Sequence, residues 1–336
     1  MFDHKHYVPI LKTKAGERLA VAGLKTRTKT KITPLFEFHK HKKLDVAAHV
    51  VEICDCLAST WGTDSPLFLD TIWLHGKAGD PEIISNVFDA ARDAQLQAVP
   101  VVRPDFDRES RSAVQRIIRK DGRGYLLRVT RKESKDVPSI DALLSSIGLL
   151  RRAVHLMIDY KGTAMDLAAD LPAISGLNQW KTLIAASGVF PRTLTSLTQG
   201  RWHQVPRNDW TSWLNAVIDR HLPRRPSYAD YTIRDPAAPA DFGSPSVNLR
   251  YAKSPYWLVS IGGKVKAGRS SQMHQVCRSL MNRTEYDGPD FSDGDLAIAD
   301  TAAEILGPGN ATQWLQWCIN HHIEFTVQDM RNHPSL

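Results

Sequence analysis

The sequence predicts an α/β fold: a (β/α)₈ barrel of the TIM type, closed or capped by a C-terminal α+β extension. Short apolar runs rich in β-branched residues alternate with amphipathic helical patterns through the first two-thirds of the chain. Eight such runs recur about every 30 residues, and most are apolar throughout, as parallel strands buried on both faces are. The length of 336 residues suits this fold. A doubly wound open sheet is the alternative, but no predicted strand is followed by its glycine-rich phosphate loop.

Each predicted strand is followed by a helix or a loop, as parallel pairing requires. The strands are YVPIL (7–11), ITPLFEF (32–38), PLFLD (66–70), QAVPVVR (97–103), GYLLRVT (124–130), AVHLMID (153–159), KTLIAAS (181–187) and SYADYTI (227–233). The helices are predicted over 15–24, 44–60, 80–96, 108–120, 139–150, 164–175 and 206–220. The third begins with Asp80 as its N-cap and Pro81 in its first turn, which is a typical helix start.

The alternation of strands and helices ends near residue 220. The stretch 221–246 contains five prolines, so it predicts an extended crossing with one short strand. Further on, the patterns predict a strand pair or one long strand over 248–264, a helix over 272–282, and a helix followed by a strand over 310–327. We therefore divide the chain into a barrel over 1–240 and a C-terminal α+β segment over 241–336 that packs on it.

The composition is that of a basic globular protein with a formal net charge of +7. Two basic blocks carry part of the excess, Lys25, Arg27, Lys29 and Lys31 in one and Lys40, Lys42 and Lys43 with His39 and His41 in the other. A basic surface favours anionic partners, and a solvated face is the alternative. The sequence has no run of about 18 apolar residues and no apolar signal-peptide core at its start, so we expect a cytoplasmic protein without a membrane span.

Polar residues lie at the C-terminal ends of most predicted strands, where parallel barrels carry their active sites. They are Lys12, Glu37, Asp70, Arg103, Arg128, Asp159 and Ser187, with Asp230 and Tyr231 at the eighth strand. Charged residues are disfavoured in buried strands unless they are paired, so these positions predict a ring around one mouth. Glu37, Asp70 and Asp159 are candidates for a general acid or base, or for divalent-cation ligands. Lys12, Arg103 and Arg128 are candidates for holding a phosphate or carboxylate, and the alternative is strand ends that simply meet water.

The other motifs point to no standard chemistry. P-loop, HExxH, GxSxG and paired CxxC patterns are absent from the sequence. His321 and His322 would point to opposite sides of a strand, so we expect packed or hydrogen-bonded histidines there. Asp293 and Asp295 flank a glycine, which favours an Asx turn before a strand-like stretch over a cation loop. We therefore assign no metal ligand outside the strand ends, and the cofactor stays open, with a divalent cation as the candidate.

With these stretches assembled, the sequence resembles the T4 beta protein family, or beta family proteins, of bacteria and phages. The resemblance rests on YVPILKTKAGE, ITPLFE, VVRPDF, LMIDYKG, VFPRTL, VPRNDWTSWL, DYTIRDP, NLRYAKSPYWLV, FSDGDLAIAD and GPGNATQWLQWCINHH, between residues 7 and 322. It implies a protein of bacteria, phages or mobile elements with a role in phage defence or its evasion, and no particular catalytic mechanism. The matching stretches contain Lys12, Glu37, Arg103 and Asp159. NLRYAK adds Arg250 and Tyr251 as ligand-binding candidates.

Two functions stay open at this point. The first is a barrel that binds an anionic, phosphorylated or nucleotide-like ligand at its strand ends, with hydrolase or phosphodiesterase chemistry if the protein is an enzyme. The second is a non-enzymatic module that recognises a phage or host protein, or a nucleic acid, through the basic region over 25–43. Strand-end residues that converge on one deep pocket favour the first, and a shallow or plugged mouth favours the second.

Overall fold

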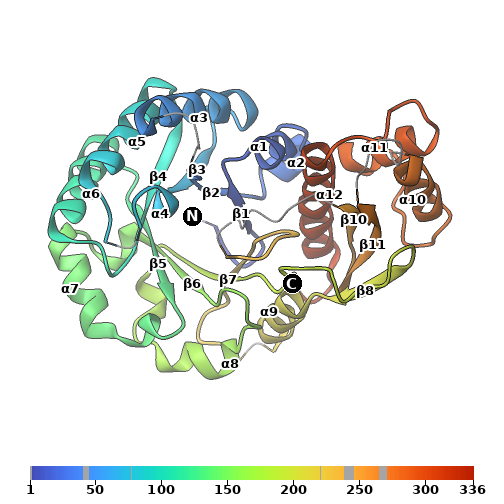
Figure 1. Ribbon diagram of the computed structural model, residues 1–336. Coiled ribbons are helices and arrows are strands. Elements are labelled where there is room, and N and C mark those ends of the chain that lie inside the picture. Colours follow the sequence, from blue (N-terminus) through green and yellow to red (C-terminus); the bar gives the residue numbers. More distant parts are fainter. Residues whose placement is uncertain (1, 41–44, 77, 220, 238–245, 265–270) are drawn as a thin grey trace.

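Eight parallel strands close into a barrel in the computed structural model (Figure 1). The structure describes residues 2–40, 45–76, 78–219, 221–237, 246–264 and 271–336. The barrel strands are β1 (Tyr7–Lys12), β2 (Leu35–Glu37), β3 (Pro66–Asp70), β4 (Gln97–Val102), β5 (Tyr125–Thr130), β6 (Val154–Asp159), β7 (Thr182–Ser187) and β9 (Ser227–Asp230). β9 pairs in parallel with both β7 and β1, which closes the barrel. The predicted fold class is confirmed, and each of the eight predicted strands overlaps an observed one.

Helices on the outside of the barrel connect successive strands (Figure 1). They are α1 (Ala15–Ala22) and α2 (Thr26–Lys29), α3 (Val46–Thr60), α4 (Ile72–His75) and α5 (Pro81–Asp93), α6 (Arg108–Asp121), α7 (Val137–Ile147), α8 (Leu167–Asp170) and α9 (Asn208–Ile218). Asp45, Asp80, Asp107 and Asp136 accept backbone N–H bonds at the starts of α3, α5, α6 and α7. Local sequence thus decides where these helices begin. The helix predicted over 164–175 is only the short α8 followed by 3-10 turns, and a proline, Pro172, lies in the first of these turns.

Alternation along the strands decides which side chains fill the barrel. The inner apolar cluster consists of Val8, Ile10, Leu35, Phe68, Val99, Val101, Leu126, Met157, Ile184, Ala186, Ala229 and Tyr231. The residues between them, such as Tyr7, Phe36 and Leu127, belong to the larger core between the strands and the helices. Because side chains alternate with a period of two, the inward-facing positions continue upward to the polar strand ends.

The C-terminal part adds a small antiparallel sheet and further helices beside the barrel (Figure 1). The sheet has the order β10–β11–β8, formed by β8 (Trp202–Pro206), β10 (Ser246–Ala252) and β11 (Tyr256–Lys264). α10 (Ser271–Met281) packs on α11 (Asp293–Ala302), and α12 (Ala311–Asn332) packs on α1, α11 and β10. α12 also contacts β1, and its His322 reaches β9. This helix therefore takes the place beside β9 and β1 that the eighth outer helix of such a barrel would occupy.

Two predictions for the C-terminal part are wrong. The strand expected at the end of 310–327 does not form, because α12 continues as one helix through this range. Its start is defined by a capping box between Asn310 and Gln313, and its buried residues recur at helical spacing. The strand-like stretch after Asp293 is also helical, because the side chain of Ser292 caps α11. Across the described residues, none of the helices combines the length and the apolar character that a membrane crossing demands.

β8 is an element that the sequence patterns did not reveal. It lies within the range assigned to the barrel, yet it pairs with β11, where Val205 faces Trp257. The chain therefore leaves the barrel after β7, adds an edge strand to the small sheet, and returns through α9 to β9. The proposed division at residue 240 stays a prediction.

Candidate functional site

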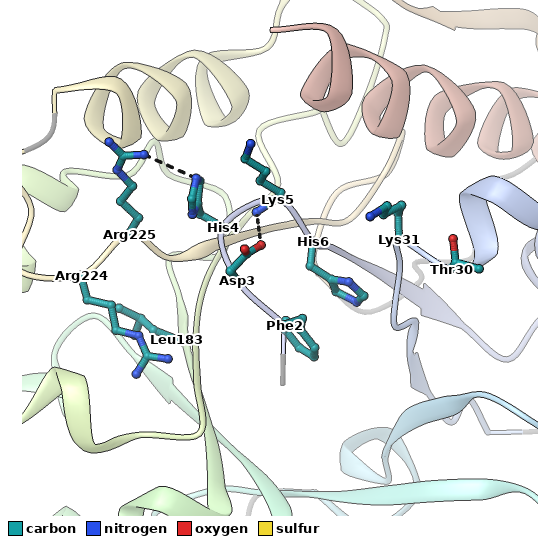
Figure 2. A pocket seen from close by; sticks show the side chains of 10 residues that line it. All are labelled: Phe2, Asp3, His4, Lys5, His6, Thr30, Lys31, Leu183, Arg224 and Arg225. Carbon is teal, nitrogen blue, oxygen red and sulfur yellow. Dashed lines mark hydrogen bonds between the residues drawn. The ribbon is translucent and has the colours of Figure 1, made fainter. Parts of the chain in front are cut away.

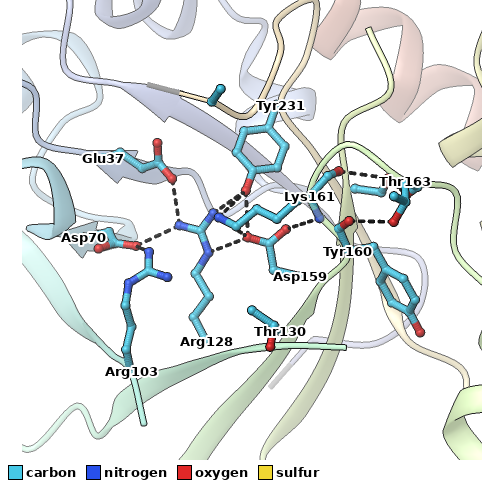
Figure 3. Close-up of polar contacts among 12 residues, drawn as sticks. Glu37, Asp70, Arg103, Arg128, Thr130, Asp159, Tyr160, Lys161, Thr163 and Tyr231 are labelled. Atoms are coloured by element: carbon cyan, nitrogen blue, oxygen red, sulfur yellow. Dashed lines mark hydrogen bonds and ion pairs between the residues drawn. The ribbon is translucent and has the colours of Figure 1, made fainter. Parts of the chain in front are cut away.

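Charged side chains take the inward-facing positions at the C-terminal strand ends (Figure 3). The ends of β1, β2 and β3 are level with one another, since Lys12 pairs with Glu37 and Glu37 with Asp70 in the sheet register. Glu37, Asp70, Arg128 and Asp159 are each at most 2% exposed. The structure thus brings these predicted residues together as a buried charged layer and not as a row of solvated ends. At this level the mouth is plugged by side chains, which is the arrangement expected above for the non-enzymatic alternative.

Arg128 is the centre of this layer (Figure 3). Its Nη1 donates to Glu37 Oε1 at 2.8 Å and to Asp70 Oδ2 at 2.7 Å. Its Nε and Nη2 donate to Asp159 Oδ2 at 3.0 and 2.8 Å. Burial opposes the charge of the guanidinium, but the acidic groups around it raise the pKa of Arg128 well above its ordinary value. One guanidinium therefore holds carboxylates from three different strands.

Two further cations lie on the solvent side of the same carboxylates. Arg103 Nη2 donates to Asp70 Oδ2 at 2.5 Å, and Lys161 Nζ lies 2.9 Å from Asp159 Oδ2. The side chain of Arg103 is 13% exposed and that of Lys161 is 43% exposed. Burial and the nearby Arg128 charge lower the pKa of Lys161. These two residues are the part of the network that meets solvent.

Lys161 and Trp73 belong to the site although the sequence analysis did not single them out. Lys161 follows Asp159 by two residues, and the Asp159 Oδ1 atom accepts its backbone N–H at 2.9 Å, so that the lysine turns back over the strand end. Trp73, on α4, donates from Nε1 to Glu37 Oε2 at 2.8 Å. The only sequence signal for either residue is its short distance from the end of a predicted strand, DYK after β6 and DTIW after β3.

Tyr231 and Lys12 complete the surroundings of the charged layer. The Tyr231 hydroxyl donates to Asp159 Oδ2 at 2.7 Å, so its ring forms part of the wall around Arg128. Lys12 is only 4% exposed, and its Nζ donates to the carbonyl oxygen of Ala237 at 3.0 Å. Burial lowers the pKa of Lys12, while the nearby Glu17 and Glu37 oppose this shift. Lys12 is therefore a buried cation at the edge of the charged layer.

Asp230 faces away from the mouth. Its Oδ2 lies 2.9 Å from His322 Nε2 on α12 and accepts the Tyr228 hydroxyl at 3.0 Å, and the Tyr7 hydroxyl donates to its Oδ1. Arg207 Nη2 lies 3.7 Å from the same carboxylate. All of these groups are buried between the barrel and the C-terminal part. Asp230 therefore helps to join the barrel to the C-terminal part. It does not belong to the ring of polar residues expected at the strand ends.

Arg250, Tyr251 and Ser187 also lie outside the charged layer. Arg250, on β10, donates from Nη1 to the carbonyl oxygen of Ile233 at 2.8 Å and lines a separate cavity. The ring of Tyr251 stacks on His321 at 3.7 Å between centroids, and its hydroxyl donates to Asp295 Oδ1 at 2.7 Å. The Ser187 hydroxyl donates to a backbone carbonyl of the loop after β6. The ligand-binding roles of these three residues stay predictions, and none of the three belongs to the mouth.

Two carboxylates of the charged layer, Asp70 and Asp159, are placed to stay ionised. Burial by itself would raise the pKa of Asp70, but Arg103 and Arg128 lower it below its ordinary value. Burial likewise opposes the charge of Asp159, and Arg128 and Lys161 lower the pKa of that carboxyl well below its ordinary value. Both groups are unprotonated near neutral pH, so neither is suited to donate a proton as a general acid.

The carboxylates converge on a side-chain cation. The guanidinium of Arg128 takes the central position between Glu37, Asp70 and Asp159, where a divalent cation would otherwise neutralise them. In the ranges that the structure describes, no three His, Cys, Asp or Glu side chains are grouped so as to hold a metal ion. The three carboxylates exceed Arg128 by two negative charges, and the solvent-side cations Arg103 and Lys161 balance these.

A separate hollow of about 700 Å³ lies at the opposite, N-terminal end of the barrel (Figure 2). Its lining includes Lys5, Lys31, Arg224 and Arg225, together with His6. Burial lowers the pKa of His6 to about 4, so this imidazole is neutral near pH 7. One of the predicted basic blocks therefore reaches this face through Lys31. In the other block, His41, Lys42 and Lys43 lie outside the described residues.

A family model described as Beta protein matches residues 7–328, nearly the whole chain. No curated protein and no solved structure matches this chain. The match covers the barrel, the small sheet and most of α12.

Proposed function

The chain belongs to the Beta protein family, and from the geometry of its strand ends we propose that it binds an anionic, phosphorylated or nucleotide-like ligand at the C-terminal mouth of the barrel. Arg103 and Lys161 are the residues that we expect to touch the ligand. The buried carboxylates of Asp70 and Asp159 hold these two side chains in position, and Arg128 in turn holds the carboxylates. A role in conflict between phages and their hosts, which the sequence resemblance implies, stays a prediction.

The observation that carries this proposal is the charged layer inside the barrel. Barrel interiors are ordinarily filled by layers of bulky apolar side chains. Replacing a buried ion pair by apolar residues of similar volume is often neutral or even stabilising, so stability alone does not require Arg128 and its three carboxylates. Departures of this kind are expected where a site needs charges held in fixed positions.

The sign of the exposed charge favours an anion. The carboxylates of Asp70 and Asp159 are buried behind Arg103 and Lys161, whose side chains reach solvent. A ligand that arrives from solvent therefore meets a guanidinium and an ammonium group before any carboxylate. A phosphate accepts charge-assisted hydrogen bonds from both kinds of group. Long-range attraction by the positively charged protein adds to this preference.

Hydrolysis of the ligand is a further step of the proposal, and Glu37 is the candidate base for it. Glu37 accepts one hydrogen bond from Arg128 and one from the neutral indole of Trp73. Asp70 and Asp159 each face two cations, which makes them weaker bases. If the mouth is catalytic, Glu37→Gln should abolish hydrolysis of a nucleotide, while binding of that nucleotide persists. Equal turnover by this variant and the wild type would exclude Glu37 as the base.

Binding itself is tested by calorimetric titration with inorganic phosphate, AMP and ATP. Lys161→Ala should weaken binding about ten-fold or more, since a hydrogen bond to a charged group contributes about 1.5–3 kcal/mol. Lys132→Ala is the matched control, because Lys132 is an exposed lysine on the loop after β5. The proposal fails if the wild type binds none of these anions, or if Lys161→Ala binds them as tightly as Lys132→Ala does.

Nucleic-acid recognition through the N-terminal face is a second candidate, favoured by the basic hollow lined by Lys5, Lys31 and Arg225. It predicts that affinity for a labelled oligonucleotide falls linearly with salt on a double logarithmic plot. Lys31→Glu should weaken this binding and Lys161→Ala should not, which separates the two faces. Affinity that does not change with salt would rule this candidate out.

A further inference from the structure

We propose that the cavity between the barrel and the small C-terminal sheet is a second ligand site, which binds a small anion that also carries an apolar, flat group. The cavity has a volume of about 960 Å³, within the range of small-molecule sites. Five parts of the chain form it: the start of α1, the segment after β9, β10, α10 and the beginning of α12. The site is separate from the mouth, and the proposal does not depend on the function proposed there.

The polar part of the cavity is cationic. Lys14, Arg234 and Arg250 line it, and among its described lining residues none is acidic. Arg234 has a partial counter-charge, because its Nε lies 3.9 Å from the buried carboxylate of Glu17. Arg250 adds a second guanidinium to this wall. A cavity with this balance attracts an anion.

Arg250 is the residue that points most clearly to a ligand. Its guanidinium donates to two neutral acceptors, Asn248 Oδ1 at 3.0 Å and the carbonyl oxygen of Ile233 at 2.8 Å. Its guanidinium lies over the ring of Phe190 at 4.7 Å from the centroid, which fixes its orientation. Burial and the neighbouring Arg234 lower the pKa of Arg250 to about 10, which means that both destabilise the charged form of its guanidinium. An anionic group in the cavity would stabilise the charged guanidinium and accept a charge-assisted hydrogen bond from it.

Five apolar residues also line the cavity: Ile233, Met273, Trp314, Leu315 and Cys318. Ligand pockets usually combine such residues with a few polar groups that fix orientation. The beginning of α12, a 22-residue helix, also lines the cavity, and the positive end of its dipole adds to the cationic character. The expected ligand therefore has a phosphate or carboxylate at one end and an apolar ring at the other.

The test compares inorganic phosphate with phenyl phosphate in calorimetric titrations of the full chain. Phenyl phosphate should bind more tightly than inorganic phosphate, because only it reaches the apolar residues. Arg250→Gln should weaken phenyl phosphate binding about ten-fold. Lys132→Ala, at an exposed lysine that does not line this cavity, should leave it unchanged. Inorganic phosphate binding that is weakened in Lys161→Ala but kept in Arg250→Gln reports on the mouth, so a failure at one site is distinguished from a failure at the other.

A second pair of variants guards against misfolding of Arg250→Gln. Ala311 is exposed in the first turn of α12 and lines the cavity. Ala311→Glu places a negative charge where a helix start tolerates it, and Ala311→Gln is its uncharged match. Ala311→Glu should abolish phenyl phosphate binding, and Ala311→Gln should retain it. The proposal is overturned if the wild type shows no saturable binding of phenyl phosphate, if phenyl phosphate binds no better than phosphate, or if the Glu and Gln variants bind it equally.

Discussion

Asp230 and Tyr231 are neighbours in sequence at the end of β9, yet their side chains lie on opposite sides of the barrel wall. The Tyr231 hydroxyl donates to Asp159 in the mouth, at 2.7 Å from Oδ2. The Asp230 carboxylate lies 2.9 Å from Nε2 of His322 on α12. This one strand end therefore connects the charged layer of the barrel with the buried polar cluster that holds the C-terminal part in place. Both networks can be tested separately.

Replacing Arg128 by Met should destabilise the protein strongly. The change leaves Glu37, Asp70 and Asp159 buried without their shared cation, and breaking a buried ion pair on one side typically costs about 3–5 kcal/mol. The measurement is the free energy of unfolding in urea at pH 7. Combining Arg128→Met with Glu37→Gln, Asp70→Asn and Asp159→Asn should recover part of the loss, because the uncompensated charges are then gone. A midpoint of unfolding unchanged in the single variant would contradict the role of Arg128.

Asp159→Asn should change how the free energy of unfolding depends on pH. The folded-state pKa of Asp159 is lowered, so its contribution to the free energy of unfolding is present above the unfolded pKa of about 4 and is lost as the pH falls below it. The wild type should exceed the variant by about 1–3 kcal/mol at pH 7. This difference should shrink steadily between pH 4 and the lowest pH at which both proteins fold. Urea titrations across this range measure it, and a difference that stays constant would speak against the lowered pKa.

Asp209 should give the opposite pH dependence. Burial, with the nearby Asp230 charge, raises the pKa of Asp209 to about 7. A raised folded-state pKa contributes stability that is complete below the unfolded pKa of about 4 and is lost as the pH rises through 7. The wild type should therefore lose on the order of 2–4 kcal/mol of unfolding free energy between pH 4 and pH 8 from this group. Asp209→Asn, which cannot titrate, should lose less over the same range. Parallel curves for the two proteins would show that folding does not raise the pKa of Asp209.

Gly294→Ala should loosen the contact between α11 and α12. A Cβ atom at Gly294 would collide with the backbone carbonyl of Trp317, which cannot move away as a side chain could. We expect a loss of about 1–3 kcal/mol, the usual cost of overpacking. Gly307→Ala is the matched control, because an added Cβ there meets no atom within 4 Å. Thermal unfolding of both variants measures the effect, and equal melting temperatures would refute the close approach of the two helices.

Much of the barrel and part of the candidate site could be predicted from sequence. Lys12, Glu37, Asp70, Arg103, Arg128 and Asp159 were found as polar residues at the ends of apolar runs, and the structure brings them to one mouth. The period of two along a strand explains this success, since it places every second residue inside the barrel. Lys161 and Trp73 were missed because they follow the strand ends in a loop and a short helix, where no sequence periodicity predicts the direction of a side chain. Their contacts depend on how the loops fold over the mouth.

The sequence by itself determined the number and order of the barrel strands, the starts of the capped helices and the presence of charges at the strand ends. These features depend on local periodicity, on capping side chains and on apolar character, and residues that are close together in the sequence supply all three signals. Tertiary structure alone decided that β8 joins β11, that α12 is a single helix against the barrel, and that Asp230 turns toward His322 while Tyr231 turns toward Asp159. Such choices depend on strand pairing and on contacts between residues far apart in the chain, whose energies no local pattern contains.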